Sequence, residues 1–117
     1  MKRNHRSLAA WKKAIELVEA VYSATRSFPR EEMFGLTSQM RRAAVSVPAN
    51  IAEGAARAGS KELVQFLNIA AASLSELDTH IEIATRIGFL CNDTLARQVD
   101  EVSGILLGLI AAVKRRA

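Results

Sequence analysis

Residues 41–59 read RRAAVSVPANIAEGAARAG, and this stretch decides the fold. Most of its residues favour an α-helix, yet Pro48 stands in mid-run, where it has no amide hydrogen to donate and its ring crowds the carbonyl of Ala44. Apolar residues nevertheless continue at alternating spacings of three and four on both sides of the proline. The pattern predicts one helix from about Thr37 to Ala58. Its expected core line is Leu36, Met40, Ala43, Val47 and Ile51.

The same spacing predicts three further helices. The first runs from Leu8 to about Ser27, the third from Ser60 to near Gly88, and the fourth begins after Asn92 or Asp93. Their leading apolar lines are Leu8, Trp11, Ile15, Val18 and Tyr22; Leu63, Leu67, Ala70, Leu74, Leu77, Ile81 and Ala84; and Leu95, Val99, Val102, Leu106, Leu109 and Val113. A short helical turn is expected at residues 30–33, after the break that Pro29 makes.

The links between these helices are short. Gly59 is expected to take the left-handed closing position, Ser60 to cap the third helix, and Asn92 or Asp93 to cap the fourth. Of the 117 residues, 50% are hydrophobic and only 5% are aromatic, which favours close helix contacts over a sandwich of strands. We therefore expect an all-α fold, an antiparallel up-down-up-down four-helix bundle, as a single domain over residues 1–117 with a flexible basic tail at 1–7.

Positive charge gathers at the two ends of the chain. The net charge is +4, yet the ends alone carry eight positive charges, which leaves −4 for residues 14–113. In the predicted topology the start of the first helix and the end of the fourth meet, so these charges form one basic pole. Such a pole suggests an anionic partner or serves solubility. The residues concerned are Lys2, Arg3, Arg6, Lys12, Lys13, Lys114, Arg115 and Arg116.

Several classes of protein are disfavoured. Cys91 is alone, so no internal disulfide can form and a reducing cytoplasm fits best. The longest uncharged apolar run, residues 102–113, is too short to span a bilayer, and no secretory leader is recognisable. His80 follows Glu76 by four residues, whereas di-iron bundles need Glu and His three apart. With no metal, cofactor or nucleophile pattern, we expect no cofactor, no catalytic residue and no enzyme.

The second helix carries a continuous polar ridge, which consists of Arg42, Ser46, Asn50, Glu53 and Arg57. Beside it lie residues with little side-chain bulk, Pro48 among them. Asn50 stands three residues before Glu53, as in a capping arrangement, so Asn50 is expected to accept hydrogen bonds from amides that the proline frees. The ridge then serves assembly. The alternative is a solvated helix face with a tolerated kink.

The first and third helices hold more apolar surface than a monomeric bundle can bury. The first has a second apolar line, at Ala10, Ala14, Leu17 and Val21. The third has one that is apolar at both ends and polar in the middle: Phe66, Ile69, Ser73, Glu76, His80, Ile83, Ile87 and Leu90. Exposed apolar surface of this kind marks partners, and a second copy of the same chain is the simplest one.

The segments LAAWKKA, FPREEMFGL, SQMRRAAVSVPANIAEGAARAGSKELVQFLNIAAASLSELDTHI and IGFL make the chain resemble the family of 23S ribosomal RNA intervening-sequence proteins over nearly its whole length. The resemblance implies a bacterial, cytoplasmic four-helix bundle that forms a homopentamer. The family includes relatives of the accessory variability proteins of diversity-generating retroelements, basic pentamers that bind nucleic acid and a reverse transcriptase. No catalytic role attaches to the motif. Its positions here are Arg41, Arg42, Ser46, Pro48, Asn50, Glu53, Gly54 and Arg57.

Together these observations predict a non-enzymatic homo-oligomer, a pentamer by resemblance, that presents basic rims to RNA or DNA. Binding through such rims is salt-sensitive and tolerant of sequence, because aromatic stacking platforms are scarce in the basic segments. Trp11 is the exception, and we expect it to face the core. The alternative is a scaffold or regulator that binds another protein and no nucleic acid.

Overall fold

The computed structural model describes residues 4–116, and these residues form helices and connecting turns without a β-strand. The elements are, in chain order, the 3-10 turn η1 (Asn4–Ser7), helix α1 (Ala9–Thr25), the 3-10 turn η2 (Arg30–Glu32), and helices α2 (Leu36–Ala55), α3 (Ser60–Arg86) and α4 (Thr94–Arg116). The predicted class and the number of long helices are therefore confirmed.

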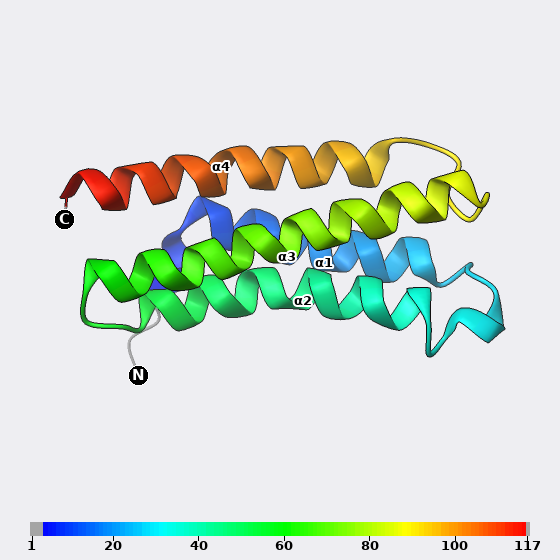
Figure 1. The fold of residues 1–117 in the computed structure, drawn as a ribbon, viewed down its shortest axis with the longest axis horizontal. Helices are drawn as coiled ribbons and strands as arrows, with labels where there is room; N and C mark the ends of the chain where they lie inside the picture. The colour runs from blue at the N-terminus through cyan, green and yellow to red at the C-terminus, as the bar shows by residue number, and fades with distance from the viewer. Residues whose placement is uncertain (1–3, 117) are drawn as a thin grey trace.

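The four helices form an antiparallel up-down-up-down bundle that measures 45 × 26 × 19 Å (Figure 1). Each helix contacts the next along the chain, and α4 returns to contact α1, so the helices close a square without diagonal contacts among the described residues. The start of α1, the turn between α2 and α3, and the end of α4 all lie at one end of the bundle (Figure 1). This arrangement is the one that the short links predict.

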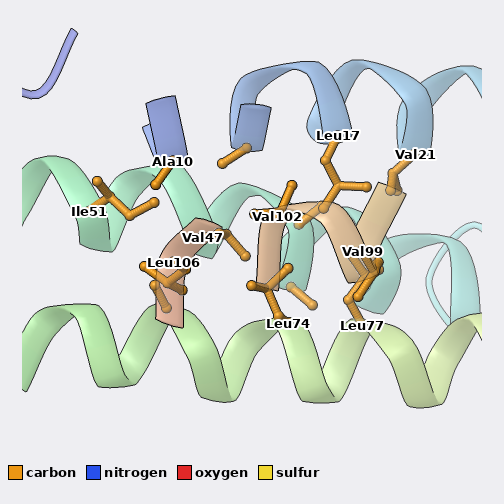
Figure 2. Packing of buried hydrophobic residues seen from close by; sticks show 14 of the residues in the cluster. Ala10, Leu17, Val21, Val47, Ile51, Leu74, Leu77, Val99, Val102 and Leu106 are labelled. Carbon is orange, nitrogen blue, oxygen red and sulfur yellow. The ribbon is translucent and has the colours of Figure 1, made fainter. Parts of the chain in front are cut away.

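The core is built from layers of aliphatic side chains contributed by all four helices (Figure 2). Leu17 of α1, Val47 of α2, Leu74 of α3 and Val102 of α4 are each at most 2% exposed. The predicted core lines of α2 and α3 are buried from Met40 to Ile51 and from Leu67 to Ala84. In α4 one position differs, because Ile110 is buried and Leu109 lies half-buried beside it.

Helix α1 has two apolar lines, and its second line is the one that faces the core. Ala10, Ala14, Leu17 and Val21 are buried, whereas the leading line from Leu8 to Tyr22 is half-buried or exposed. Small residues at positions 10 and 14 let the backbone of α1 approach its neighbours closely, which fixes this rotation. The second apolar line is thus the fully buried one, while Leu8, Trp11 and Val18 of the leading line pack against the border of the core.

The helix ends depart from the prediction at the turn between α2 and α3. Helix α2 ends at Ala55 rather than Ala58, Gly59 is extended at φ −117°, and neither Gly59 nor Ser60 makes a side-chain cap. The left-handed glycine is instead Gly88, with φ +88°, after α3. Asn92 behaves as predicted, because its Oδ1 accepts a hydrogen bond from the amide of Thr94 at 3.1 Å.

Residues 4–7, which we expected in a flexible tail, form η1 and contact both α1 and α2. The predicted turn after Pro29 is present as η2. Glu32 of this turn also caps α2, since its Oε1 accepts a hydrogen bond from the amide of Leu36 at 3.1 Å. Within the described part of the chain, none of the helices has the length and apolar character required to cross a bilayer.

Candidate functional site

The polar ridge of α2 lies along the seam between α2 and α3. At the centre of this seam the Ser46 and Ser73 hydroxyls form a hydrogen bond with an Oγ–Oγ distance of 2.8 Å. Ser73 also donates to the carbonyl of Ile69 at 3.1 Å, which leaves Ser46 as the donor between the two serines in that geometry. The ridge therefore joins two helices of one protomer, in addition to presenting polar groups to solvent.

Asn50 acts as a donor, so the role predicted for it was wrong. Its Nδ2 donates to the Ser46 carbonyl at 2.8 Å and to the Ser46 hydroxyl at 3.0 Å. Helix α2 runs through Pro48 without interruption, and so no new helix start exists for Asn50 to cap. Side chains on a helix lean toward its N-terminus, which places the Asn50 amide over the preceding turn. Asn50 thus completes a three-residue network with Ser46 and Ser73.

Gly54 of the motif lies where α2 and α3 approach each other closely. A Cβ atom added at Gly54 would lie 2.8 Å from the Cβ of Phe66 and 3.2 Å from the carbonyl oxygen of Leu63. No ordinary side chain fits without separation of the helices, because both of those atoms are held by the α3 backbone. The glycine therefore sets the spacing of the seam.

The arginines of the motif point in different directions. Arg57 pairs with Glu53, with Nη2 2.6 Å from Oε1, and its guanidinium lies 5.0 Å from the centre of the Phe66 ring. Arg41 is not part of the ridge and reaches α1, where its Nε donates to the Thr25 hydroxyl at 2.9 Å and its guanidinium stacks on Tyr22. Arg41 consequently braces α1 against α2, whereas Arg57 covers the end of the seam.

Arg42 is the exposed arginine at the N-terminal end of the ridge. It borders a depression of about 340 Å³ together with Gln39, Ser46, Ser73 and Glu76. Beside this depression the Nε2 atom of the buried His80 lies 3.6 Å from Glu76. These groups include no nucleophile paired with a base, and the described residues contain no cluster of three or more residues that could hold a metal ion. Cys91 is exposed, in the turn before α4.

The second predicted site is the basic pole. The structure gathers Lys114, Arg115 and Arg116 in the last turn of α4, at one end of the bundle (Figure 1). Arg6 stands in η1, just before α1. Lys12 and Lys13 lie further along α1, where Lys13 contacts Glu101, 13 residues before Lys114 and hence about 20 Å from it along α4, so Lys13 does not join the cluster at the end of α4. Lys2 and Arg3 lie outside the described residues. Of the described cations of this site, Lys13 makes ion pairs. Among the described residues the other five have none: Arg6, Lys12, Lys114, Arg115 and Arg116.

Lys61 also belongs to the basic pole, although sequence reasoning missed it. It stands in the first turn of α3 and lines a shallow depression of about 450 Å³ with Ser60, Val64, Gln65 and Lys114. Two ammonium groups from different helices therefore face one surface, next to the positive end of the α3 dipole. The sequence could have indicated Lys61, because in an up-down-up-down bundle the turn between α2 and α3 lies at the same end as the two chain termini.

Lys13 is already neutralised within the protomer. Its Nζ lies 3.4 Å from Glu101 of α4 and 3.7 Å from Glu16 of α1. The negative charge of Glu101 in the first place, and of Glu16 in the second, raises the pKa of the Lys13 ammonium above its ordinary value. Lys13 thus ties α1 to α4 and contributes less to the outward positive field than its position suggests.

Trp11 is half-buried at the border of the basic pole. It packs on the core, as predicted, but one part of its ring is covered by residues of η1. The Arg6 guanidinium lies 5.6 Å from the ring centre, and His5 meets the ring edge-on at 5.1 Å. These contacts explain why residues 4–7 are fixed against the bundle.

The comparison with family models places residues 6–108 in the family described as 23S rRNA-intervening sequence protein, and the chain belongs to that family. A similar solved structure is a protein of unknown function from the S23 ribosomal protein family of Bacteroides thetaiotaomicron. It superposes with a TM-score of 0.81 at 20% identity, over 87% of this chain and 98% of that one, which establishes the shared fold. No curated protein sequence matches the chain.

Proposed function

We propose that this chain is a non-enzymatic, homo-oligomeric protein of the bacterial cytoplasm that binds RNA or DNA through its basic pole. The observation that carries the proposal is the meeting of Lys61 of α3 and Lys114 of α4 beside one depression, at the end of the bundle where Arg115 and Arg116 also lie. Lys61, Lys114, Arg115 and Arg116 are without an ion-pair partner among the described residues, so their charge is available to phosphates.

Self-association is the second part of the proposal, and we take the homopentamer that the resemblance implies. Ile69, Ile83 and Ile87 of α3 are between 45% and 54% exposed, on the side of α3 that adjoins the seam. A ring of five would cover such residues and repeat the basic pole five times on one rim. Contacts that are individually weak then add up through multivalency, which suits an electrostatic, sequence-tolerant mode of binding.

One observation favours the alternative, a scaffold that binds another protein and no nucleic acid. Phe34 is 97% exposed and Met33 is 47% exposed, at the end of the bundle opposite the basic pole. Aromatic and methionine side chains are enriched where proteins bind one another. On this alternative the basic pole serves solubility, and Phe34→Ala abolishes capture of the partner without changing the oligomeric mass.

The first test is the solution mass of the purified protein by light scattering, together with the ratio of its absorbance at 260 and 280 nm. A mass five times that of the protomer with co-purifying nucleic acid supports the proposal. A pentamer that is free of nucleic acid, and does not bind added RNA at low salt, favours the scaffold. A monomer contradicts the assembly part of the proposal.

A further inference from the structure

The outward face of α4 is apolar and flat at its centre. Leu107 is 58% exposed there, the highest exposure of a leucine among the described residues. Gly104 and Gly108 flank it with open space beyond their Cα atoms, and Ala111 is exposed one turn further on. Spacings of three and four put these positions on one side of the helix. Among the described elements of the protomer, α4 contacts α1 and α3 alone, and neither covers this face.

The charges at the two ends of this face have opposite signs. Asp100 and Glu101 precede the apolar centre, while Lys114 and Arg115 follow it, and all four side chains are exposed. Glu101 contacts Lys13, but Asp100, Lys114 and Arg115 have no ion-pair partner among the described residues. The face is therefore complementary to a copy of itself that runs in the opposite direction.

We propose that α4 pairs with α4 of a second copy, antiparallel, about a two-fold axis between positions 107 and 108. In this register each residue meets the partner residue for which the two numbers add up to 215. Asp100 then faces Arg115, and Glu101 faces Lys114, twice over in the pair. These ion pairs and the small residues at the centre point to one occupant, which is a second copy of this chain.

The same register fits the side chains at the centre. Leu107 of one copy lies on Gly108 of the other, and Gly104 lies opposite Ala111, so each of these pairs includes a glycine. Helix axes approach most closely where the contact residues are small, which lets the protruding leucines interlock. This explains why open glycines and an exposed leucine occur together on one helix face.

The paired α4 contact is distinct from the ring. A two-fold contact buries the same patch on both copies, whereas a five-membered ring needs two different patches. The pairing consequently turns a protomer into a dimer, and in a ring it joins one ring to another. A mass measurement can therefore distinguish the failure of the α4 pairing from the failure of the proposed ring, because only the ring changes the mass fivefold.

A cysteine cross-linking experiment tests the register directly. In a Cys91→Ser background, Gly104→Cys and Ala111→Cys are introduced singly and together, and the purified proteins are oxidised and separated under denaturing conditions. The combined variant should form a covalent dimer, because positions 104 and 111 of opposing copies meet. In each single variant the two cysteines are about 10 Å apart along the axis, beyond disulfide reach, so little dimer should form. Equal cross-linking of single and combined variants overturns the register.

Charge exchange provides the second test, by light scattering on nucleic-acid-free protein. Leu107→Asp, Asp100→Arg and Arg115→Asp should each lower the mass at moderate protein concentration, by a factor of two where the pairing joins two protomers. The exchange Asp100→Arg with Arg115→Asp should restore the larger mass, which a variant that merely misfolds would not do. A wild-type mass that none of these changes alters, or an exchange that fails to restore it, overturns the pairing.

Discussion

Gly54→Ala adds one methyl group at a tight contact in the seam between α2 and α3. The new Cβ would stand 2.8 Å from the Cβ of Phe66, 3.1 Å from Leu63 Cδ1 and 3.2 Å from the Leu63 carbonyl oxygen. The Phe66 Cβ and the Leu63 carbonyl cannot rotate away, because they are attached to the α3 backbone. We therefore expect a cost near the upper limit for overpacking, about 3 kcal/mol.

Alanine also favours the helix over glycine by about 1 kcal/mol, which offsets part of that cost. The free energy of unfolding should thus fall by about 2 kcal/mol, and the Tm by roughly 8 °C for a chain of this size. Urea and thermal unfolding, followed by circular dichroism at equal and low protein concentration, measure both quantities, since association adds stability at higher concentration.

Gly104→Ala provides the matched control. Within the described residues nothing lies within 4 Å of a Cβ at Gly104, so the same chemical change on an open helix face should stabilise the protein by about 0.5–1 kcal/mol. The expected signs are therefore opposite. A Gly54→Ala protein that is as stable as the wild type, or more stable, would refute the reasoning from the seam.

Three further perturbations test separate contacts. Ser73→Ala removes the hydrogen bond to Ser46 and should lower the free energy of unfolding by about 1 kcal/mol in urea titrations, with no effect if the serines are merely solvated. Glu101→Gln should lower the pKa of the Lys13 ammonium toward its ordinary value, as measured by NMR titration. The ion pair stabilises the wild type at pH values below the ordinary lysine pKa, and this stability is lost as the pH rises through the raised pKa of Lys13, so the variant should lack it. An unchanged Lys13 pKa contradicts the pairing. Pro48→Ala restores a backbone donor to α2, and a changed mass distribution in light scattering is expected if the proline shapes that helix for assembly, whereas an identical distribution counts against the idea.

The helices themselves were predictable because their apolar spacing is regular, and the core of α3 from Leu67 to Ala84 follows that spacing at every position. Spacing alone could not orient α1, which has two apolar lines at different angles. The small side chains of Ala10 and Ala14 decide the matter through close packing, a property of the assembled bundle. Likewise, the sequence contains Gly59 and Gly88 near helix ends, and only the path of each turn determines which one needs a positive φ.

The candidate site, too, was predictable from the sequence only in part. Ser46, Asn50 and Gly54 stood out as one motif, yet their partners Ser73 and Phe66 depend on the register between α2 and α3, which no local pattern specifies. Asn50 was assigned the wrong direction of hydrogen bonding, because its role depends on whether the helix restarts after Pro48. At the basic pole the charges were evident, while the neutralisation of Lys13 by Glu101 required the packing of α1 on α4.

The central claim of this account is that the basic pole binds nucleic acid. The most direct measurement is the titration of a fluorescent single-stranded RNA with the protein at about 50 mM and about 200 mM salt, followed by anisotropy. The wild type is compared with a variant in which residues 114–116 are changed to Gln. The matched control changes Arg26, Arg30 and Arg97, at the opposite end of the bundle, to Gln, so that the net charge is lowered equally.

The account predicts that the wild type binds at low salt and loses affinity as salt increases. The variant at the basic pole should bind less tightly and reduce the slope of log affinity against log salt by roughly 2, since each phosphate contact on a single strand contributes about 0.7. The control variant should keep most of the affinity. Equal losses in the two variants, or no binding by the wild type at low salt, would contradict the claim.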